Sequence, residues 1–377
     1  MDGAAKTRRM RAAHRRGLAT LSALAVLALA AGLVASRASA TPHVPTRVLG
    51  FYTDWDPASY TTLAAHYRDI SVLSPGWLMF AADSSLVHDD VSQEVRVHAF
   101  VADKHPGFKL EPLVADWDPG PLAGALAATT KRTSLAASIT AEAQANGWQG
   151  VNIDFEGLPD TSRGDLTAFM QALYADARPL GLEVSEDVGV EDPVFDSAAL
   201  ARRTDFLVPM FYDEHWSTGS PGPIAGQQWF THALNALLKV VPASKVVVGI
   251  GNYGYDWKRG AAEASGIDYP GALALAHAKR RTIALDSASL NPRFFYGAHS
   301  VWLLDAITAF NEVSAASKYG VAGYAVWKLG GEDPTLWRVL HRRDSLTATV
   351  ARSLATKKRS VTYSGKRRLI VAETVRP

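Results

Sequence analysis

Short apolar runs recur along the chain, and longer stretches separate them. Eight of these runs are nearly continuous in apolar residues, as expected for parallel strands covered on both faces. The eight predicted strands span residues 47–52, 70–74, 110–116, 150–156, 182–188, 206–213, 246–253 and 323–327.

Between the fourth and fifth predicted strands, the apolar positions change to a helical period. They lie three or four residues apart and would form one face of an amphipathic helix. A polar residue at 160–162 could cap the start of this helix, and Pro179 and Gly181 would end it. The apolar positions are Leu166, Phe169, Met170, Leu173, Tyr174 and Ala177.

Eight strands that alternate with helices predict an α/β fold, a closed (β/α)8 TIM barrel over residues 45–340. A doubly wound open sheet is the structural alternative, but eight strands favour closure. The interval between strands seven and eight is too long for one helix. It predicts a small insertion at about residues 257–295, followed by a helix over 299–316. Residues 341–377 would be a basic C-terminal tail with short strands at 361–363 and 369–371.

The first 40 residues have the pattern of an export signal. Six basic side chains precede an uncharged apolar run from Leu18 to Ala35, and Ala38-Ser39-Ala40 resembles a cleavage site. The apolar run is near the lower length limit for spanning a bilayer, so an uncleaved membrane anchor remains an alternative. We therefore expect an exported protein: secreted, in the cell wall, or anchored facing outward.

Charge and cysteine content narrow the function classes. Residues 41–350 hold 24 basic and 35 acidic side chains, a net charge of −11, which argues against nucleic acid as the ligand. The chain has no cysteine, which excludes a thiol nucleophile and a cysteine zinc site. The basic tail could touch an anionic wall or membrane, although a solvated tail is the simpler interpretation. Its charged residues include Lys357, Lys358, Arg359, Lys366, Arg367 and Arg368.

The fourth predicted strand carries the candidate chemistry. Because side chains alternate along a strand, Asn152, Asp154 and Glu156 share one face, which would point into the barrel mouth. Two carboxylates this close cannot both ionise freely, so one should keep its proton at neutral pH, as a general acid must. A polar barrel layer without catalysis is the alternative interpretation.

The segment Gln149-Gly150-Val151-Asn152-Ile153-Asp154-Phe155-Glu156 resembles the motif Asp-Gly-x-Asp-x-Asp-x-Glu of glycoside hydrolase family 18, the chitinase-like barrels. Gln149 and Asn152 depart from that motif; Asn at the second place also occurs in members that act on spore peptidoglycan. Three further segments are similar to the family in the same order along the chain. They are Met210-Phe211-Tyr212-Asp213, Gly251-Asn252-Tyr253-Gly254-Tyr255-Asp256-Trp257, and Trp327 at the end of strand eight.

The resemblance implies a retaining hydrolase of β-linked N-acetylglucosamine polymers, in which the substrate supplies its own nucleophile. Glu156 would be the general acid, Asp154 would bind the acetamido N–H, and Tyr212 would align its carbonyl. Asp213, Trp327, Tyr253 and Trp257 would bind the sugar. No metal or organic cofactor is needed. The substrate would be peptidoglycan, chitin or a related exopolysaccharide.

The resemblance also frames a prediction for Asn152. In the family pattern a carboxylate at this place can share a proton with the middle Asp. An amide cannot ionise, but it can donate a hydrogen bond to Asp154. We therefore expect Asp154 to stay more persistently anionic, with a shifted acidic limb of the pH–rate profile rather than inactivity.

Other side chains are weaker candidates. Glu186 and Asp187 on strand five could line the cleft or serve as plain hydrogen-bonding groups, and Trp77 could be a stacking platform or a core residue. Glu214, His215 and Trp216 follow the strand-six motif and could shape a sugar subsite.

Two other functions remain open from the sequence. One is a non-catalytic barrel that only holds glycan, which the presence of Glu156 and Asp154 disfavours. The other is an accessory domain of a cell-surface polysaccharide system. The oligomeric state is not predicted.

Overall fold

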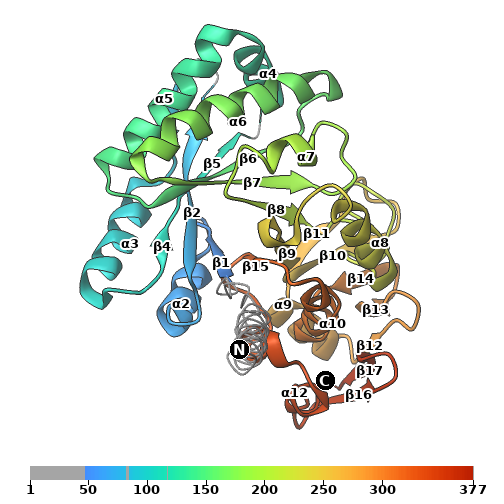
Figure 1. Cartoon of the computed structure of the whole chain (residues 1–377). Helices are drawn as coiled ribbons and strands as arrows, with labels where there is room; N and C mark the ends of the chain where they lie inside the picture. Colours follow the sequence, from blue (N-terminus) through green and yellow to red (C-terminus); the bar gives the residue numbers. More distant parts are fainter. Residues whose placement is uncertain (1–46, 82–84, 117, 377) are drawn as a thin grey trace, which may run out of the picture. The chain divides into compact units, whose positions relative to one another are not determined.

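The computed structural model describes residues 47–81, 85–116 and 118–376 of the 377-residue chain (Figure 1). The predicted export segment lies outside the described residues. Within those ranges, no helix is both long and apolar enough to cross a bilayer.

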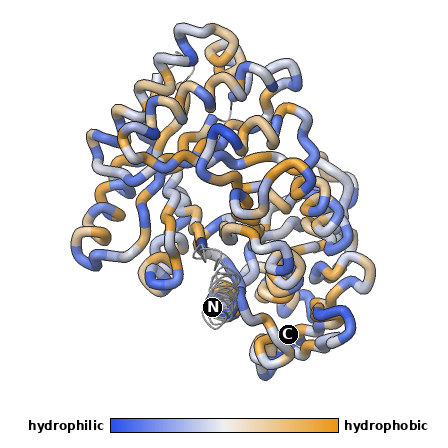
Figure 2. Tube along the Cα trace, in the orientation of Figure 1, coloured by the Kyte–Doolittle hydropathy of each residue, from blue (hydrophilic) through white to orange (hydrophobic). Residues whose placement is uncertain are grey.

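Eight parallel strands form a closed barrel, as predicted. The closure is explicit in the pairing, because β1 bonds to β15 on one side and to β2 on the other. Figure 2 shows that apolar residues run along much of the strand trace. The strands in barrel order are β1 (Arg47–Tyr52), β2 (Val72–Phe80), β5 (Leu113–Asp116), β6 (Gly150–Phe155), β7 (Glu183–Gly189), β8 (Phe206–Met210), β9 (Val247–Gly251) and β15 (Gly323–Trp327).

Helices and short strands surround this barrel. β3 (Leu86–His88) and β4 (Lys109–Leu110) both pair with β2. The predicted amphipathic helix is α6 (Arg163–Ala177), with a 3-10 turn on each side. The other helices outside the insertion are α2 (Pro57–His66), α3 (Val91–Lys104), α4 (Pro119–Ala127), α5 (Thr129–Ala145), α7 (Ser197–Leu200), α8 (Gln227–Leu237), α10 (Ala306–Ala316), α11 (Leu336–His341) and α12 (Ala348–Ser353).

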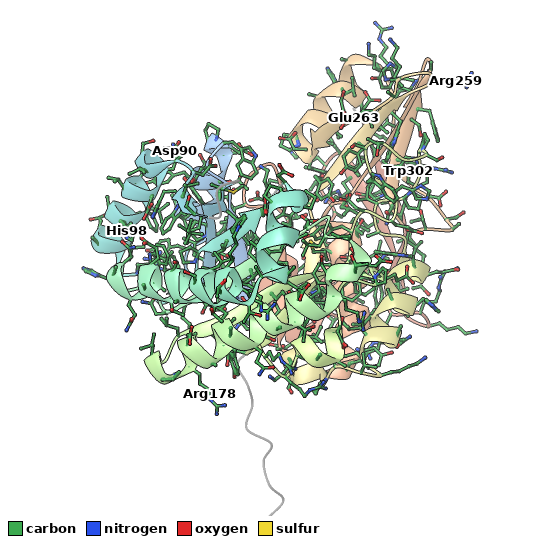
Figure 3. The ribbon with its side chains drawn as sticks, turned by 90° about the horizontal axis from the view of Figure 1, so that it is seen from above. Asp90, His98, Arg178, Arg259, Glu263 and Trp302 are labelled. Atoms are coloured by element: carbon green, nitrogen blue, oxygen red, sulfur yellow. The ribbon has the colours of Figure 1, made fainter. Side chains whose placement is uncertain are left out.

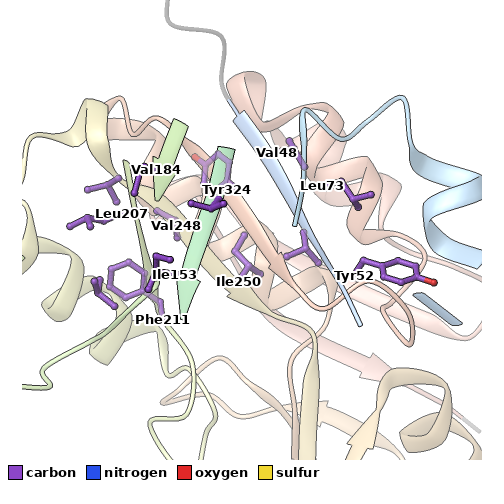
Figure 4. Packing of buried hydrophobic residues seen from close by; sticks show 14 of the residues in the cluster. Val48, Tyr52, Leu73, Ile153, Val184, Leu207, Phe211, Val248, Ile250 and Tyr324 are labelled. Atoms are coloured by element: carbon purple, nitrogen blue, oxygen red, sulfur yellow. The ribbon is translucent and has the colours of Figure 1, made fainter. Parts of the chain in front are cut away.

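Alternate residues of the barrel strands face two separate regions, an outer core against the helices and the interior of the barrel. The outer core lies between strands and helices and includes Ile153, Val184 and Leu207 (Figure 4). The inner core fills the barrel and includes Leu113 and Val208. This division decides which strand residues can reach the barrel mouth.

The insertion between β9 and β15 is larger than the predicted 257–295. Its strands begin at Tyr253 and end at Leu303, so the helix expected over 299–316 begins only at Ala306. The segment 299–303 pairs antiparallel with both β10 and β13, which is why it is a strand. Figure 3 shows Arg259, Glu263 and Trp302 of the insertion to one side of the barrel helices. Its elements are β10 (Tyr253–Lys258), β11 (Ser265–Asp268), α9 (Tyr269–Ala278), β12 (Ile283–Leu285), β13 (Pro292–Tyr296) and β14 (His299–Leu303).

The C-terminal residues form a hairpin that joins the insertion. β16 (Arg359–Ser364) and β17 (Leu369–Val375) pair with each other, and β17 pairs with β12, which completes a seven-stranded sheet. The predicted short strands therefore exist, but they belong to the sheet of the insertion.

Arg359 corrects the view of the tail as a solvated basic segment. Its side chain is 2% exposed and lies among three carboxylates. Nη2 is 2.5 Å from Asp333 and 3.4 Å from Asp305, and Nε is 2.8 Å from Glu373. Buried charges need such partners, so this residue ties the hairpin to the end of the barrel.

We predict that Arg359→Ala destabilises the protein by about 3–5 kcal/mol, because it leaves buried carboxylates without their cation. Thermal or denaturant unfolding measures the change. The exposed neighbour Lys357 provides the matched control, since Lys357→Ala should change stability by less than about 0.5 kcal/mol. Equal stability of the two variants would contradict a role of Arg359 in anchoring the hairpin.

Candidate active site

The fourth barrel strand presents its polar residues to the barrel interior, as predicted. Asn152 and Asp154 of β6 lie in register with Leu113 and Ala115 of β5, which belong to the inner core. Glu156 follows directly after β6 and is exposed at the carboxyl end of the strand. The acid and the adjacent carboxylate thus reach the open end of the barrel, where barrel enzymes place their chemistry.

The two carboxyl groups share an electronegative region, with Asp154 in the barrel interior and Glu156 at its exposed mouth. Asp154 is 6% exposed, and burial together with the charge of Glu156 raises its pKa well above the ordinary value. Loss of hydration, followed by the charges of Asp213 and Asp192, raises the pKa of Glu156. A carboxyl group with a raised pKa retains its proton nearer to neutral pH, which suits a general acid.

Tyr212 is surrounded by carboxyl groups of the site. It lies just after β8, and burial and four carboxylates raise its pKa well above the ordinary value, so its hydroxyl stays protonated and can donate. The four carboxylates, in order of effect, are Asp187, Asp154, Glu156 and Asp213.

Asp213 is held by two tyrosines from the insertion. Its Oδ1 accepts hydrogen bonds from the Tyr253 hydroxyl at 2.6 Å and from the Tyr255 hydroxyl at 3.1 Å. Asp213 has φ of 59°, in the left-handed region that residues other than glycine rarely adopt. Tyr253 therefore lies at the site, and in this structure it positions Asp213.

Asn152 does not make the predicted hydrogen bond to Asp154. Its Nδ2 donates to Ser185 Oγ at 2.9 Å and to Asp187 Oδ1 at 3.1 Å, both on β7. Burial and the charge of Glu156 raise the pKa of Asp154, which opposes the persistent anion expected from the sequence. The carboxylate of Asp187, one strand away, explains the missing hydrogen bond, because it accepts from the Asn152 amide in place of Asp154.

Trp327 lies at the end of β15, beside the barrel mouth. Its ring meets Phe51 edge to face, with centroids 5.3 Å apart. The two rings line a narrow pocket together with Asp154. The predicted sugar floor and the central carboxylate therefore share one pocket.

Trp257 does not line this pocket. It is 5% exposed, packs with Trp302 in the core of the insertion, and donates a hydrogen bond to the Gly219 carbonyl at 3.1 Å. The structure gives its predicted role in sugar binding no support, because β10 turns the side chain towards the insertion core. Trp77 is fully buried and packs near Trp148, so it is a core residue.

The two acidic residues of β7 face opposite ways. Asp187 lies in register with Val208 of the inner core, whereas Glu186 lies in register with Ile153 and Leu207 of the outer core. Only Asp187 therefore points into the barrel.

The loop after β8 is ordered by its own polar groups. Glu214 accepts a hydrogen bond from the Gly226 N–H at 2.7 Å, and His215 Nδ1 lies 2.8 Å from the Ser220 carbonyl oxygen. Trp216 of the same loop is 53% exposed and remains accessible.

Residues after β1 were not among the sequence candidates. Trp55 lines the pocket of Trp327 and Asp154, as does Asp89, which follows β3. The sequence could have indicated Trp55, because this residue follows the end of a predicted strand, where the functional groups of a barrel gather.

Asp54 is a buried carboxyl group in this loop. It is 8% exposed, and neither oxygen has a hydrogen-bond partner within the described part of the chain. Burial, followed by the charges of Asp90, Asp89 and Glu94, raises its pKa to about 7.

Comparison with known proteins agrees with this architecture. The family model of the glycosyl hydrolases family 18 matches residues 47–332. An uncharacterized glycosylase of Bacillus subtilis, YvbX, is 22% identical over 314 residues, which cover 77% of this chain and 90% of that protein. The cortical fragment-lytic enzyme of Bacillus cereus is 26% identical over 236 residues, or 58% of this chain. The match spans only 55% of that enzyme's length.

Solved structures share the fold at low sequence identity. A chitinase from Chromobacterium violaceum superposes with a TM-score of 0.72 at 24% identity, covering 80% of this chain and 99% of that one. The spore cortex-lytic enzyme SleL of Bacillus megaterium gives a TM-score of 0.70 at 21% identity, covering 79% of this chain and 74% of that one.

We predict that Asp54→Asn stabilises the protein at about pH 8 and has little effect at about pH 4. The pKa of Asp54 in the folded state is raised, so its favourable contribution exists at low pH and is lost as the pH rises through about 7. The amide removes that loss. Melting temperatures of parent and variant across this range measure the effect; a difference independent of pH would contradict it.

Proposed function

The chain belongs to the glycosyl hydrolases family 18, and from that membership we propose that it cleaves β-linked N-acetylglucosamine polymers with retention of anomeric configuration. The observation that carries the proposal is the placement of Asp154 and Glu156 at the mouth of the barrel, beside Tyr212. This arrangement supplies an acid, an anion and a hydroxyl donor at the carboxyl end of the barrel strands.

The first step breaks the glycosidic bond. The acetamido carbonyl oxygen of the sugar attacks its own anomeric carbon, and the electron pair of the broken bond goes to the leaving oxygen. Glu156, whose pKa is raised, protonates that oxygen. The substrate serves as nucleophile, so no carboxylate of the protein forms a bond to the sugar.

The same step places positive charge on the acetamido group. Asp154 accepts the acetamido N–H and offsets this charge, while the Tyr212 hydroxyl donates to the acetamido oxygen and aligns it. Asp213, held by two tyrosine hydroxyls, helps position the sugar, and Trp327 forms the floor of the pocket.

The second step returns the site to its starting state. Water attacks the anomeric carbon and opens the oxazolinium ring, and the carboxylate of Glu156 takes the proton from that water. Two displacements at one carbon leave the anomeric configuration unchanged.

Peptidoglycan is the polymer that the relatives favour. Cortical fragment-lytic enzymes are among the matched proteins, and Asn152 stands where some spore peptidoglycan hydrolases also have Asn.

The export segment expected at residues 1–40 would bring the barrel to that polymer. Finding the native chain only in the cytoplasm by cell fractionation would contradict this location.

We predict that the purified protein releases new reducing ends from peptidoglycan, chitin oligomers or β-1,6-linked N-acetylglucosamine polymer, and that Glu156→Gln lowers the rate by about 10²–10⁴-fold. Tyr212→Phe should retain the fold and lose less activity, because it removes one aligning hydrogen bond. Product analysis by mass spectrometry measures both. Glycan binding without new reducing ends, unchanged in Glu156→Gln, would instead establish a non-catalytic glycan-binding barrel.

We also predict that cleavage requires the N-acetyl group at the bond that is cut. A substrate de-N-acetylated at that sugar lacks the nucleophile and should be resistant, whereas de-N-acetylation of distant sugars should matter less. Comparison of matched oligosaccharides measures this. Equal cleavage of both substrates would rule out attack by the substrate's own carbonyl.

A further inference from the structure

Two carboxyl groups lie side by side inside the barrel on neighbouring strands. Asn152 of β6 is in register with Ser185 of β7, and Ile153 is in register with Glu186. One step further along the same parallel register, Asp154 stands beside Asp187, and both point inward. Neighbouring parallel strands lie about 4.8 Å apart, so the two side chains are close.

The surroundings of this pair provide little hydration. Asp187 is 2% exposed and Asp154 is 6% exposed. Asp154 Oδ1 and Asn152 Oδ1 are both buried, with no hydrogen-bond donor among the residues described. Neighbouring acceptors without a donor are satisfied most simply when a carboxyl group there carries a proton.

Asn152 fixes the orientation of Asp187. The 3.1 Å bond from Asn152 Nδ2 engages Oδ1 of Asp187, and Ser185 takes the other amide hydrogen at 2.9 Å. Asn152 thus has no hydrogen left to donate to Asp154.

The pKa of Asp187 reflects its closeness to Asp154. Burial, followed by the charge of Asp154, raises the pKa of Asp187 well above its ordinary value, while the bond from Asn152 acts in the opposite direction. Two buried carboxyl groups in contact lose their protons in two separated steps that belong to the pair.

We propose that Asp187 is a positioning residue that shares one proton with Asp154 and keeps it when Asp154 binds the acetamido group as an anion. This role rests on the proposed hydrolysis. In the free protein the pair holds one proton. When the sugar N–H reaches Asp154, the proton resides on Asp187, and it returns when the product leaves. The proton only moves between the two carboxyl groups, so no other reactant is needed.

The chain thereby provides on β7 the carboxyl group that the family motif has at the position of Asn152. Asp187 is also the first of the carboxylates whose charges, after burial, raise the pKa of Tyr212.

The test compares pH–rate profiles of the parent, Asp187→Asn and the exchange variant Asn152→Asp/Asp187→Asn, on the polymer that the parent cleaves. Asp187→Asn removes the neighbouring charge, so Asp154 should ionise more readily and the acidic limb of kcat/KM should move to lower pH by about one unit or more. The exchange variant restores a carboxyl neighbour and should return the limb towards that of the parent.

Glu186→Gln is the matched control. It removes a buried carboxyl group from the adjacent residue of β7, which faces the outer core and has the smallest charge effect on Asp187, so the limb should move far less than in Asp187→Asn. A merely structural role of Asp187 would lower the rate by the same factor at every pH and leave the limb in place. That result, or a limb that the exchange variant fails to restore, overturns the proposal.

Two further measurements test the proposal if the comparison of pH–rate profiles fails. Should Asp187→Asn not fold, Asn152→Asp adds a third carboxyl group to the pair and should move the limb to higher pH; an unchanged limb overturns the proposal.

Should the parent cleave no glycan, the proposed function fails, and unfolding decides the proton sharing alone. Melting temperatures of Asp154→Asn, Asp187→Asn and the double variant form a double-mutant cycle. A coupling that grows from about pH 4 to about pH 8 supports a shared proton, and additive effects at every pH overturn it.

Discussion

The site depends on one constraint: several carboxyl groups lie so close together in the barrel interior and at its mouth that they cannot all be charged. Asp154, Asp187 and Glu156 all have raised pKa values, with burial as the leading cause and neighbouring carboxylates adding to it. Repulsion of this kind keeps protons on groups that would lose them in water. The repulsion between carboxylates thus provides a carboxylic acid that can donate a proton at neutral pH.

The barrel produces this crowding through its register. Parallel strands bring alternate residues of β6 and β7 to the same level inside the barrel, and the strand ends bring Glu156 and Tyr212 to the same edge. The opposite faces of the same strands pack against helices, which fixes the inward side chains. The insertion contributes from outside, because two of its tyrosine hydroxyls hold Asp213.

Much of this could be predicted from the sequence. Continuous apolar runs located all eight barrel strands, and alternation along strand four placed Asn152 and Asp154 correctly on the inner face. Contacts between elements distant in sequence could not be predicted. The bond from Asn152 to Asp187 depends on strand register, the burial of Trp257 depends on how the insertion folds, and that of Arg359 depends on where the hairpin packs. Local pattern carries no information on these pairings.

The anomeric form of the first product tests the central claim most directly, because it reports on the number of displacements at the anomeric carbon. Proton NMR in the first minutes of cleavage, before mutarotation, distinguishes the two forms. A reaction in which the substrate attacks itself and water follows gives the β-anomer of the new reducing end. Initial formation of the α-anomer would mean that water attacks directly, and it would contradict the account of Asp154, Glu156 and Tyr212 given above.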